Sequence, residues 1–207
     1  MSETSESMAT AGLPTRHGTF RVIAVSRDVV AEDHLVVVKG AVAGRSAVPV
    51  RVHSECLTGD VLGSRRCDCR AQLEGALELI ERRGLGVLIY LRQEGRGIGL
   101  FNKIRAYRLQ EQGRDTVEAN LELGFASDLR SYQDAARLIR LLEVESVMLI
   151  TNNQAKINGV RQEGIRVEGR IPLVVEPDEH NARYLKTKAL KLGHLLGHPA
   201  RSHPEQS

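Results

Sequence analysis

The sequence predicts an α/β fold in which a mixed β-sheet is flanked by helices, in a single compact domain with a β-rich N-terminal part. Two observations lead to this prediction. Short β-branched runs come first along the chain, and after them strand-like runs alternate with stretches of helical period. Strands that come first and then alternate with helices are typical of an α/β domain with a mixed sheet.

The β-rich part contains three runs of β-branched residues, each bounded by Gly, Asp or Ser. They are "GTFRVIAVS" at 18–26, "DHLVVVKG" at 33–40 and "VPVRVHS" at 48–54. Alternating or short continuous apolar runs of this length predict strands. The small and polar residues before them predict a disordered tail over 1–11, so we expect the folded domain to cover 12–196.

Helical period begins after the third strand. In 69–84 apolar residues recur at helical spacing and Gly84 supplies a stop, so we expect a helix there. The apolar run "GVLIYL" at 86–91 predicts a buried strand, and 98–113 predicts a helix that ends at a glycine. The segment 115–130 shows little periodicity and is expected to be a long ordered loop, of the kind that tends to carry function.

The rest of the chain alternates between the two types. Ser131 is expected to cap a helix, because a serine hydroxyl accepts hydrogen bonds from the first backbone amides. The expected elements are a helix at 132–142, a strand at 146–151, a helix at 154–164, a strand at 165–175, a helix at 180–196 and a disordered tail at 197–207.

Composition restricts the class of protein. The chain has 207 residues and a net charge of only +3, which is too weak to indicate nucleic-acid binding. Its apolar runs are too short to span a bilayer, so no membrane association is expected. The start carries no basic and apolar signal segment, and we expect a cytoplasmic protein with reduced thiols.

All three cysteines lie in one short stretch. Cys56, Cys67 and Cys69 have the spacing Cys-x10-Cys-x-Cys, and an odd number cannot close into disulfides within the chain. Clustered cysteines in a reducing compartment favour a metal site or chemistry over a structural role. Three ligands leave one position of a tetrahedral zinc for water, which is the catalytic arrangement.

Two other interpretations of the thiols stay open. The cysteines would be inert if they were simply buried and reduced. A closed structural site would need His53 as a fourth ligand, but in a strand His53 and Cys56 point to opposite faces. Three thiolates and Zn²⁺ sum to one negative charge, which we expect the flanking Arg65, Arg66 and Arg70 to offset.

With its other motifs, the sequence resembles GTP cyclohydrolase II in its stand-alone form, the enzyme that opens riboflavin biosynthesis. The resemblance runs from about "GLPT" to "GHLL". It rests on "RVHSECLTGD", "RCDC" with "QLE", "RQEGRGIGL", "NKIRAY", "DTVEAN", "LGFASDLR", "LITNN" and "YLKTKALKLGHLL".

The resemblance implies a homodimer that binds one Zn²⁺ per chain and uses Mg²⁺ with the triphosphate. It implies hydrolysis of GTP to formate, pyrophosphate and 2,5-diamino-6-(5-phosphoribosylamino)pyrimidin-4(3H)-one. It makes Cys56, Cys67 and Cys69 the zinc ligands. It assigns the catalytic roles to Asp128 as proton acceptor, Arg130 as nucleophile toward the α-phosphate and Tyr107 in the ring chemistry. The implied GTP contacts are Arg51, Val52, His53, Ser54, Glu55, Gln72, Glu94, Gly95, Arg96, Thr116, Thr151 and Lys156.

Several of these residues have an interpretation of their own. The turn "EGRG" between a strand and a helix exposes backbone amides that suit a phosphate, with Arg96 adding charge. Glu94 repels phosphate, so a contact with the guanine edge is more sensible for it. Tyr107 alone reads as a half-buried core residue. A guanidinium in water has no free lone pair, so the plainer role of Arg130 is electrostatic stabilisation.

The sequence also departs from the usual pattern at three positions. Arg70 stands where the family commonly has Gly, Gln154 replaces a helix-starting Pro, and Ser131 replaces a frequent Asp. Two alternatives to the full reaction therefore stay open. One is a paralogue that stops at the formamide product for another pathway. The other is a zinc-containing nucleotide-binding protein without turnover.

Overall fold

A computed structural model describes residues 7–26, 33–126 and 129–173. A seven-stranded sheet forms its centre, in the order β1-β2-β3-β5-β4-β6-β7. The strands are β1 (Ser7–Thr15), β2 (Gly18–Ser26), β3 (His34–Lys39), β4 (Val48–Ser54), β5 (Gly86–Leu91), β6 (Val147–Ile150) and β7 (Val167–Ile171). The α-helices are α1 (Cys69–Arg83), α2 (Gly99–Glu111), α3 (Thr116–Glu122), α4 (Gln133–Leu141) and α5 (Gln154–Gln162).

The sheet is mixed, as the sequence predicts. Its first half is antiparallel, since β1, β2, β3 and β5 pair in turn with reversed direction. Its second half is parallel, because β4 pairs in parallel with β5 and β6, and β6 pairs in parallel with β7. The parallel strands all end at the same edge, which in open α/β sheets is the edge where ligands bind.

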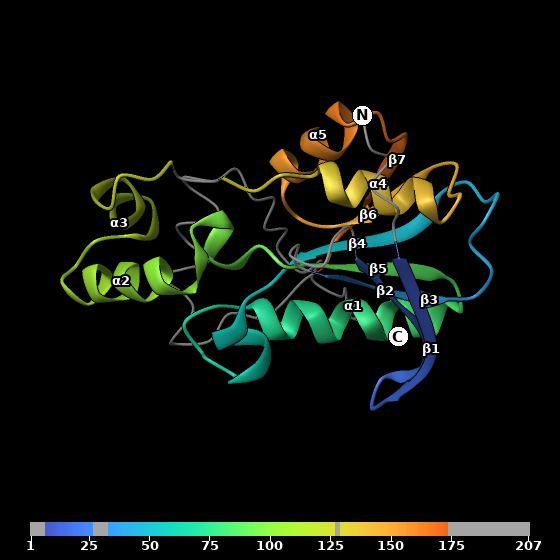
Figure 1. Ribbon diagram of the computed structural model, residues 1–207, viewed down its shortest axis with the longest axis horizontal. Coiled ribbons are helices and arrows are strands. Elements are labelled where there is room, and N and C mark those ends of the chain that lie inside the picture. Colours follow the sequence, from blue (N-terminus) through green and yellow to red (C-terminus); the bar gives the residue numbers. More distant parts are fainter. Residues whose placement is uncertain (1–6, 27–32, 127–128, 174–207) are drawn as a thin grey trace, which may run out of the picture.

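Helices cover both faces of the sheet (Figure 1). On one face α1 packs through Ala76 and Ile80 against Phe20, Val37 and Leu88. On the other face α4 and α5 cover the larger core cluster, in which the β-branched residues of the central strands are almost fully buried. Six of the seven residues of β4 are buried because this strand has a neighbour on each side and helices on both faces.

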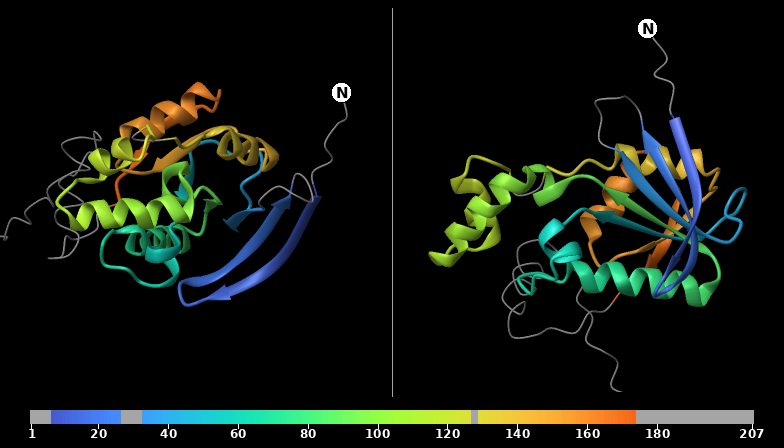
Figure 2. Two further views of the ribbon diagram at one scale, coloured as in Figure 1. Left: turned by 60° about the vertical axis from the view of Figure 1, so that its left-hand side comes forward. Right: turned by 60° about the horizontal axis from the view of Figure 1, so that its bottom comes forward.

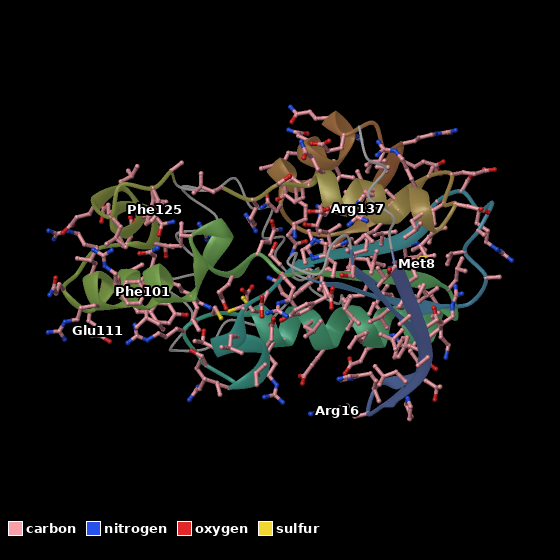
Figure 3. The ribbon with its side chains drawn as sticks, viewed as in Figure 1. Met8, Arg16, Phe101, Glu111, Phe125 and Arg137 are labelled. Atoms are coloured by element: carbon pink, nitrogen blue, oxygen red, sulfur yellow. The ribbon has the colours of Figure 1, made fainter. Side chains whose placement is uncertain are left out.

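Two parts extend from this body. The β1–β2 hairpin forms one side edge of the sheet, and α2 and α3 project from the end of the sheet where β4 and β5 end (Figure 2). Phe101 lies on α2 in this projection (Figure 3) and is 76% exposed. The outer surface of α2 and α3 is therefore partly exposed, and their inner surface faces the end of the sheet.

The predicted strands and helices between 18 and 171 are present, with small shifts at their ends. Two predictions need correction, and two others are not tested. Residues 7–11, expected in a disordered tail, belong to β1, whose residues are nearly all exposed and which is held by its pairing with β2. The expected loop over 115–130 contains α3. The predicted helix at 180–196 and the tail at 197–207 lie outside the described residues.

The start of α3 shows why periodicity missed it. Asp115 accepts hydrogen bonds from the backbone amides of Val117 and Glu118, and the Glu118 side chain accepts one from the Asp115 amide. This is a capping box, a local signal of a helix start that does not depend on apolar spacing. At α4, Ser131 does accept a hydrogen bond from the amide of Gln133, at 3.2 Å, but Tyr132 occupies the cap position.

Candidate active site

A pocket lies where the parallel strands β4, β5 and β6 end and where α2 and α3 project from the sheet. Among the described residues, six cationic residues line it, against two carboxylates, Glu55 and Glu94. The excess of positive charge and the position at the strand ends suit an anionic ligand. The cations are Arg51, Arg66, Arg96, Lys103, Arg130 and Lys156, and the lining also includes all three cysteines.

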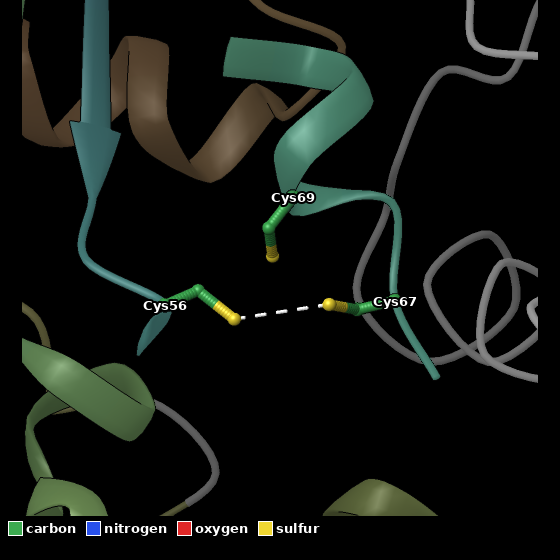
Figure 4. Close-up of side chains that lie close together, drawn as sticks. All are labelled: Cys56, Cys67 and Cys69. Atoms are coloured by element: carbon green, nitrogen blue, oxygen red, sulfur yellow. Dashed lines mark hydrogen bonds between the residues drawn. The ribbon is translucent and has the colours of Figure 1, made fainter. Parts of the chain in front are cut away.

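The thiol cluster, which consists of Cys56, Cys67 and Cys69, converges in this pocket (Figure 4). Cys56 follows the end of β4, Cys67 lies in the next loop, and Cys69 is the first residue of α1. Their sulfur atoms all lie within 4.8 Å of one another, and those of Cys56 and Cys67 are 3.7 Å apart. Two sulfurs each about 2.3 Å from a tetrahedral zinc would be about 3.8 Å apart, so the cluster fits zinc.

A short π-helix, η1 (Leu57–Val61), brings the backbone close to the three sulfurs. A Cβ atom on Gly59 would lie 2.9 Å from the Cys67 sulfur and 3.0 Å from the Cys56 sulfur. Only a residue without a side chain fits this position. The "LTGD" motif therefore has glycine at this position because a side chain would clash with two of the sulfurs.

The thiols differ in acidity because they share protons. Hydrogen bonds from Cys67 and Cys69, together with one from Lys103, lower the pKa of Cys56 against the opposing effect of burial. The hydrogen bond with Cys56 raises the pKa of Cys67 to about 11, and hydrogen bonds with both neighbours also raise the pKa of Cys69. Cys56 therefore loses its proton more readily than Cys67 and Cys69. A metal that binds all three as thiolates must displace the protons that remain on them.

In the described part of the chain, Lys103 is a cation in direct contact with the thiol cluster. Its ammonium lies 3.1 Å from the Cys56 sulfur and 2.8 Å from the Glu94 carboxylate, and the residue is 8% exposed. Burial would lower the pKa of Lys103, but its hydrogen bonds with Glu94 and Cys56 raise it above the usual value. Lys103 is therefore charged. It was missed in the sequence because it lies 47 residues from Cys56.

The expected arginine neighbours of the cluster have other partners. Arg66 pairs with Glu111 at 2.6 Å and lies over the Tyr107 ring at 5.0 Å. Arg70 pairs with Glu74, one helical turn along α1. We expected the flanking arginines to offset the cluster charge, and for Arg66 and Arg70 this needs correction. Both are paired with carboxylates, and Lys103 is the cation that touches a thiol sulfur.

Tyr107 follows Lys103 by one turn of α2 and lines the same pocket. Its hydroxyl lies 3.1 Å from the Thr58 hydroxyl, which in turn lies 3.8 Å from the Cys56 sulfur. Burial raises the pKa of Tyr107, so its phenol is protonated at neutral pH. The phenol is therefore half-buried, carries its proton and lies beside the thiol cluster.

His53 lies in the pocket lining but is bound to Asp60. Its Nε2 atom is 3.1 Å from one Asp60 oxygen, which also accepts from the Cys56 amide and the Tyr90 hydroxyl. Burial lowers the pKa of His53, so the ring is neutral. Within the described residues the metal-ligating group contains the three cysteines and no histidine, which argues against a closed site with His53.

Buried cations reach the pocket from β4 and α5. Arg51 donates to the Ile150 carbonyl and to Gln72, at 3.0 and 2.5 Å. Burial lowers the pKa of Arg51 to about 10, which leaves it charged. Lys156 donates to the Val52 carbonyl at 2.6 Å. Asn153 caps α5 by accepting from the Ala155 and Lys156 amides, so the helix start is capped with Gln154 at its first position.

The turn η2 (Glu94–Gly97) connects the pocket with the segment that carries Arg130. Arg96 adopts the left-handed conformation, with φ of 63°, and its carbonyl accepts from the Leu129 amide at 3.1 Å. A Cβ on Gly97 would lie 3.1 Å from that of Leu129. This close approach holds the Leu129–Arg130 segment against the turn and places Arg130 in the pocket lining.

These features fall within a match to a known family. The family model described as GTP cyclohydrolase II matches residues 6–172. This range includes the whole sheet and every residue that lines the pocket except Leu173.

The chain belongs to the GTP cyclohydrolase II family.

Several relatives support this assignment. A protein of Picrophilus torridus named GTP cyclohydrolase-2 is 53% identical over 186 residues, which are 90% of this chain and 96% of the relative. The riboflavin biosynthesis protein RibBA of Bacillus subtilis is 56% identical over 185 residues, and that of Bacillus velezensis is 57% identical. These matches cover 89% of this chain but 46% of each RibBA protein, so the chain spans about half the length of these relatives.

The GTP cyclohydrolase II residues implied by the sequence mostly meet in the pocket. Three thiols, Tyr107 and Arg130 line it, and so do all the implied GTP contacts except one. The exception is Val52, whose side chain is 1% exposed in the core. Asp128 lies outside the described residues.

The structure adds pocket residues that sequence reasoning missed. Asn120 lies one turn after Thr116 on α3, is 3% exposed and lines the pocket with it. Their spacing of four residues within "DTVEAN" is a signal of a shared helix face, but the weak periodicity of the segment predicts a loop.

In the described residues no helix is long and apolar enough to cross a membrane.

Proposed function

We propose that the protein hydrolyses GTP, opening the imidazole ring with release of formate and removing pyrophosphate. The product would be 2,5-diamino-6-(5-phosphoribosylamino)pyrimidin-4(3H)-one, at the first step of riboflavin biosynthesis. One observation carries this proposal: a three-thiol cluster and six cations line the same pocket. Such a pocket offers a soft metal site for one end of a nucleotide and positive charge for the other.

Zn²⁺ is the cation that the thiol cluster would hold, because three sulfurs at tetrahedral spacing suit it. When bound, zinc supplies the Lewis acidity that makes water nucleophilic enough to attack the ring carbon between the two imidazole nitrogens. Tyr107 would donate a proton to the ring nitrogen that leaves, since its phenol is protonated and lies on the same side as Cys56.

The cationic residues would bind the triphosphate. Arg130 and Arg51 lie close enough that the charge of Arg130 helps burial to lower the pKa of Arg51. An anion between two such cations relieves their repulsion, so the pocket favours a phosphate chain. Arg130 would stabilise the charge that develops at the α-phosphorus, because a guanidinium keeps its proton. Asp128 as proton acceptor and Mg²⁺ on the triphosphate complete the proposal.

Glu94 is a proposed guanine contact that also has a role within the protein. One oxygen accepts from the Leu57 amide, and the other accepts from Gly95 and Lys103, at 2.7 to 2.8 Å. A carboxylate has about four lone-pair sites, so one remains for a donor on the guanine edge. A homodimer is proposed on the family resemblance alone.

The test is to incubate the zinc-loaded protein with GTP and Mg²⁺ and to measure formate and pyrophosphate in the same reaction. We expect both products in equal amounts. Pyrophosphate with a formamide and no formate would identify the paralogous reaction. Binding of GTP without any turnover would overturn the proposal in favour of a nucleotide-binding protein.

A further inference from the structure

Lys103 occupies a place that none of the assigned roles explains. It is a buried cation on α2, and its ammonium touches a thiol sulfur, that of Cys56, at 3.1 Å. Only 10% of its side chain is exposed, so solvent does little to screen the charge. Among the described residues, Arg66 and Arg70 direct their charges to Glu111 and Glu74 instead.

Glu94 fixes the position of this ammonium. One oxygen accepts from Lys103 at 2.8 Å, and the other accepts at 2.7 Å from the amide of Leu57, which directly follows Cys56. The carboxylate therefore binds both the ammonium and the backbone beside the thiol. A Cβ on Gly95 would lie 3.2 Å from the Lys103 Cβ, so the turn also packs against the lysine stem.

We propose that Lys103 is a positioning residue of the metal site, which holds the Cys56 sulfur and draws electron density from this one ligand. The proposal rests on the proposed function only in assuming that the thiol cluster binds a divalent metal. Three thiolates and a divalent cation sum to one negative charge, and the ammonium, although Glu94 also binds it, donates directly to one of these thiolates. Groups that hydrogen-bond to metal ligands orient them and tune the metal.

The consequence is a stronger Lewis acid. A thiolate that accepts a hydrogen bond from a cation donates less charge to the metal, so the metal polarises a fourth ligand more strongly. The three thiolates thereby become unequal, with Cys56 the weakest donor. This inequality has a spectroscopic signature, since sulfur-to-metal charge transfer needs more energy when the sulfur lone pair is stabilised.

The experiment compares the cobalt-substituted full-length protein with three variants. Lys103→Met removes the donor and keeps the length of the side chain. Lys103→Arg keeps a cationic N–H donor. Arg70→Met is the matched control, because it removes a cation beside Cys69 that pairs with Glu74 rather than with a thiol. Glu94 keeps its two backbone donors in Lys103→Met, so its carboxylate is not left without partners.

We expect the sulfur-to-cobalt charge-transfer band of Lys103→Met to move to lower energy at unchanged intensity per cobalt. Formate release by the zinc form of this variant should fall by about 10- to 100-fold, the usual effect of losing a partner of a metal ligand. Lys103→Arg should recover most of the band position and of the rate. Arg70→Met should match the wild type in both.

An unmoved band in Lys103→Met would overturn the proposal. So would a loss of one thiolate's share of the intensity, because Lys103 would then only keep Cys56 on the metal. The cobalt spectrum does not depend on turnover. If the band shifts as expected while the wild type releases no formate from GTP, the proposed function fails and the role of Lys103 stands.

Discussion

The thiol cluster and the cations of the same pocket are assembled in different ways. The three cysteines come from one stretch of 14 residues, folded around η1 and the start of α1. Of the six pocket cations, Arg66 lies within the cysteine stretch, but the others come from separate segments. They are Arg51 from β4, Arg96 from η2, Lys103 from α2, Arg130 from the segment before α4, and Lys156 from α5. A local loop builds the first group, and the parallel topology of the sheet brings the second together.

This difference suggests a division of work. The thiol cluster is already close to metal geometry, so its chemistry depends on a metal and on few side chains around it. The cations lie around a longer surface that suits a flexible anion such as a triphosphate. If the two groups act on opposite ends of GTP, damage to one should leave part of the activity of the other.

Cys67→Ser should have the largest effect and should separate the two activities most clearly. Loss of one thiolate should abolish formate release, because ring attack needs the metal, while pyrophosphate release partly survives and gives GMP. The measurement is both products from one reaction, with circular dichroism and GTP binding to establish that the variant is folded. Complete loss of both activities in such a folded variant would show that the two groups do not act separately.

Arg130→Ala should impair the reaction at the triphosphate end of GTP. Removing one cation that stabilises a phosphoryl transition state costs about 10²- to 10³-fold in rate, so pyrophosphate release should fall by this amount. Ring opening should fall with it if phosphate chemistry comes first. Zinc content, measured by metal analysis, should stay at the wild-type value. A variant that keeps its pyrophosphate rate would remove Arg130 from the reaction.

The same contrast explains what the sequence could predict. The cysteine cluster was found from spacing, because its members are close along the chain. Apart from α3, the strands and α-helices between 18 and 171 are predicted correctly, because buried apolar residues repeat at the period of each element. Lys103 was missed because its contact with Cys56 joins α2 to the end of β4, and no local pattern records such a contact.

Two elements escaped for other physical reasons. β1 buries almost nothing, so it has no apolar alternation, and its strand conformation comes from nine paired residues of β2. α3 has seven residues, too few for a convincing period, and its signal lies in the Asp115 and Glu118 capping box. The family resemblance implies a GTP contact for Val52 as part of the run from Arg51 to Glu55, but the Val52 side chain is buried in the core.

Tyr107→Phe should sharpen the contrast with a smaller effect. The phenol is protonated at neutral pH because burial raises its pKa, and its hydroxyl lies near the thiols through Thr58. Loss of one general acid costs about 10²-fold, so formate release should fall by that factor. GTP binding should stay near the wild-type value, since the phenol is not an anchor. Formate release at the wild-type rate would remove Tyr107 from the ring chemistry.

The smallest expected effect comes from a single methyl group under the thiols. In Gly59→Ala the new Cβ would lie 2.9 and 3.0 Å from the sulfurs of Cys67 and Cys56, closer than such atoms approach. The sulfurs must then move apart by a few tenths of an ångström, and we expect zinc affinity to fall by about 10-fold. Competition with a chromophoric chelator measures this affinity. Gly12→Ala is the control, because no atom lies within 4 Å of the Cβ position there, and it should bind zinc like the wild type. Equal affinity in both variants would mean that the thiol cluster tolerates displacement, and its geometry would then be less fixed than that of a site built for one metal.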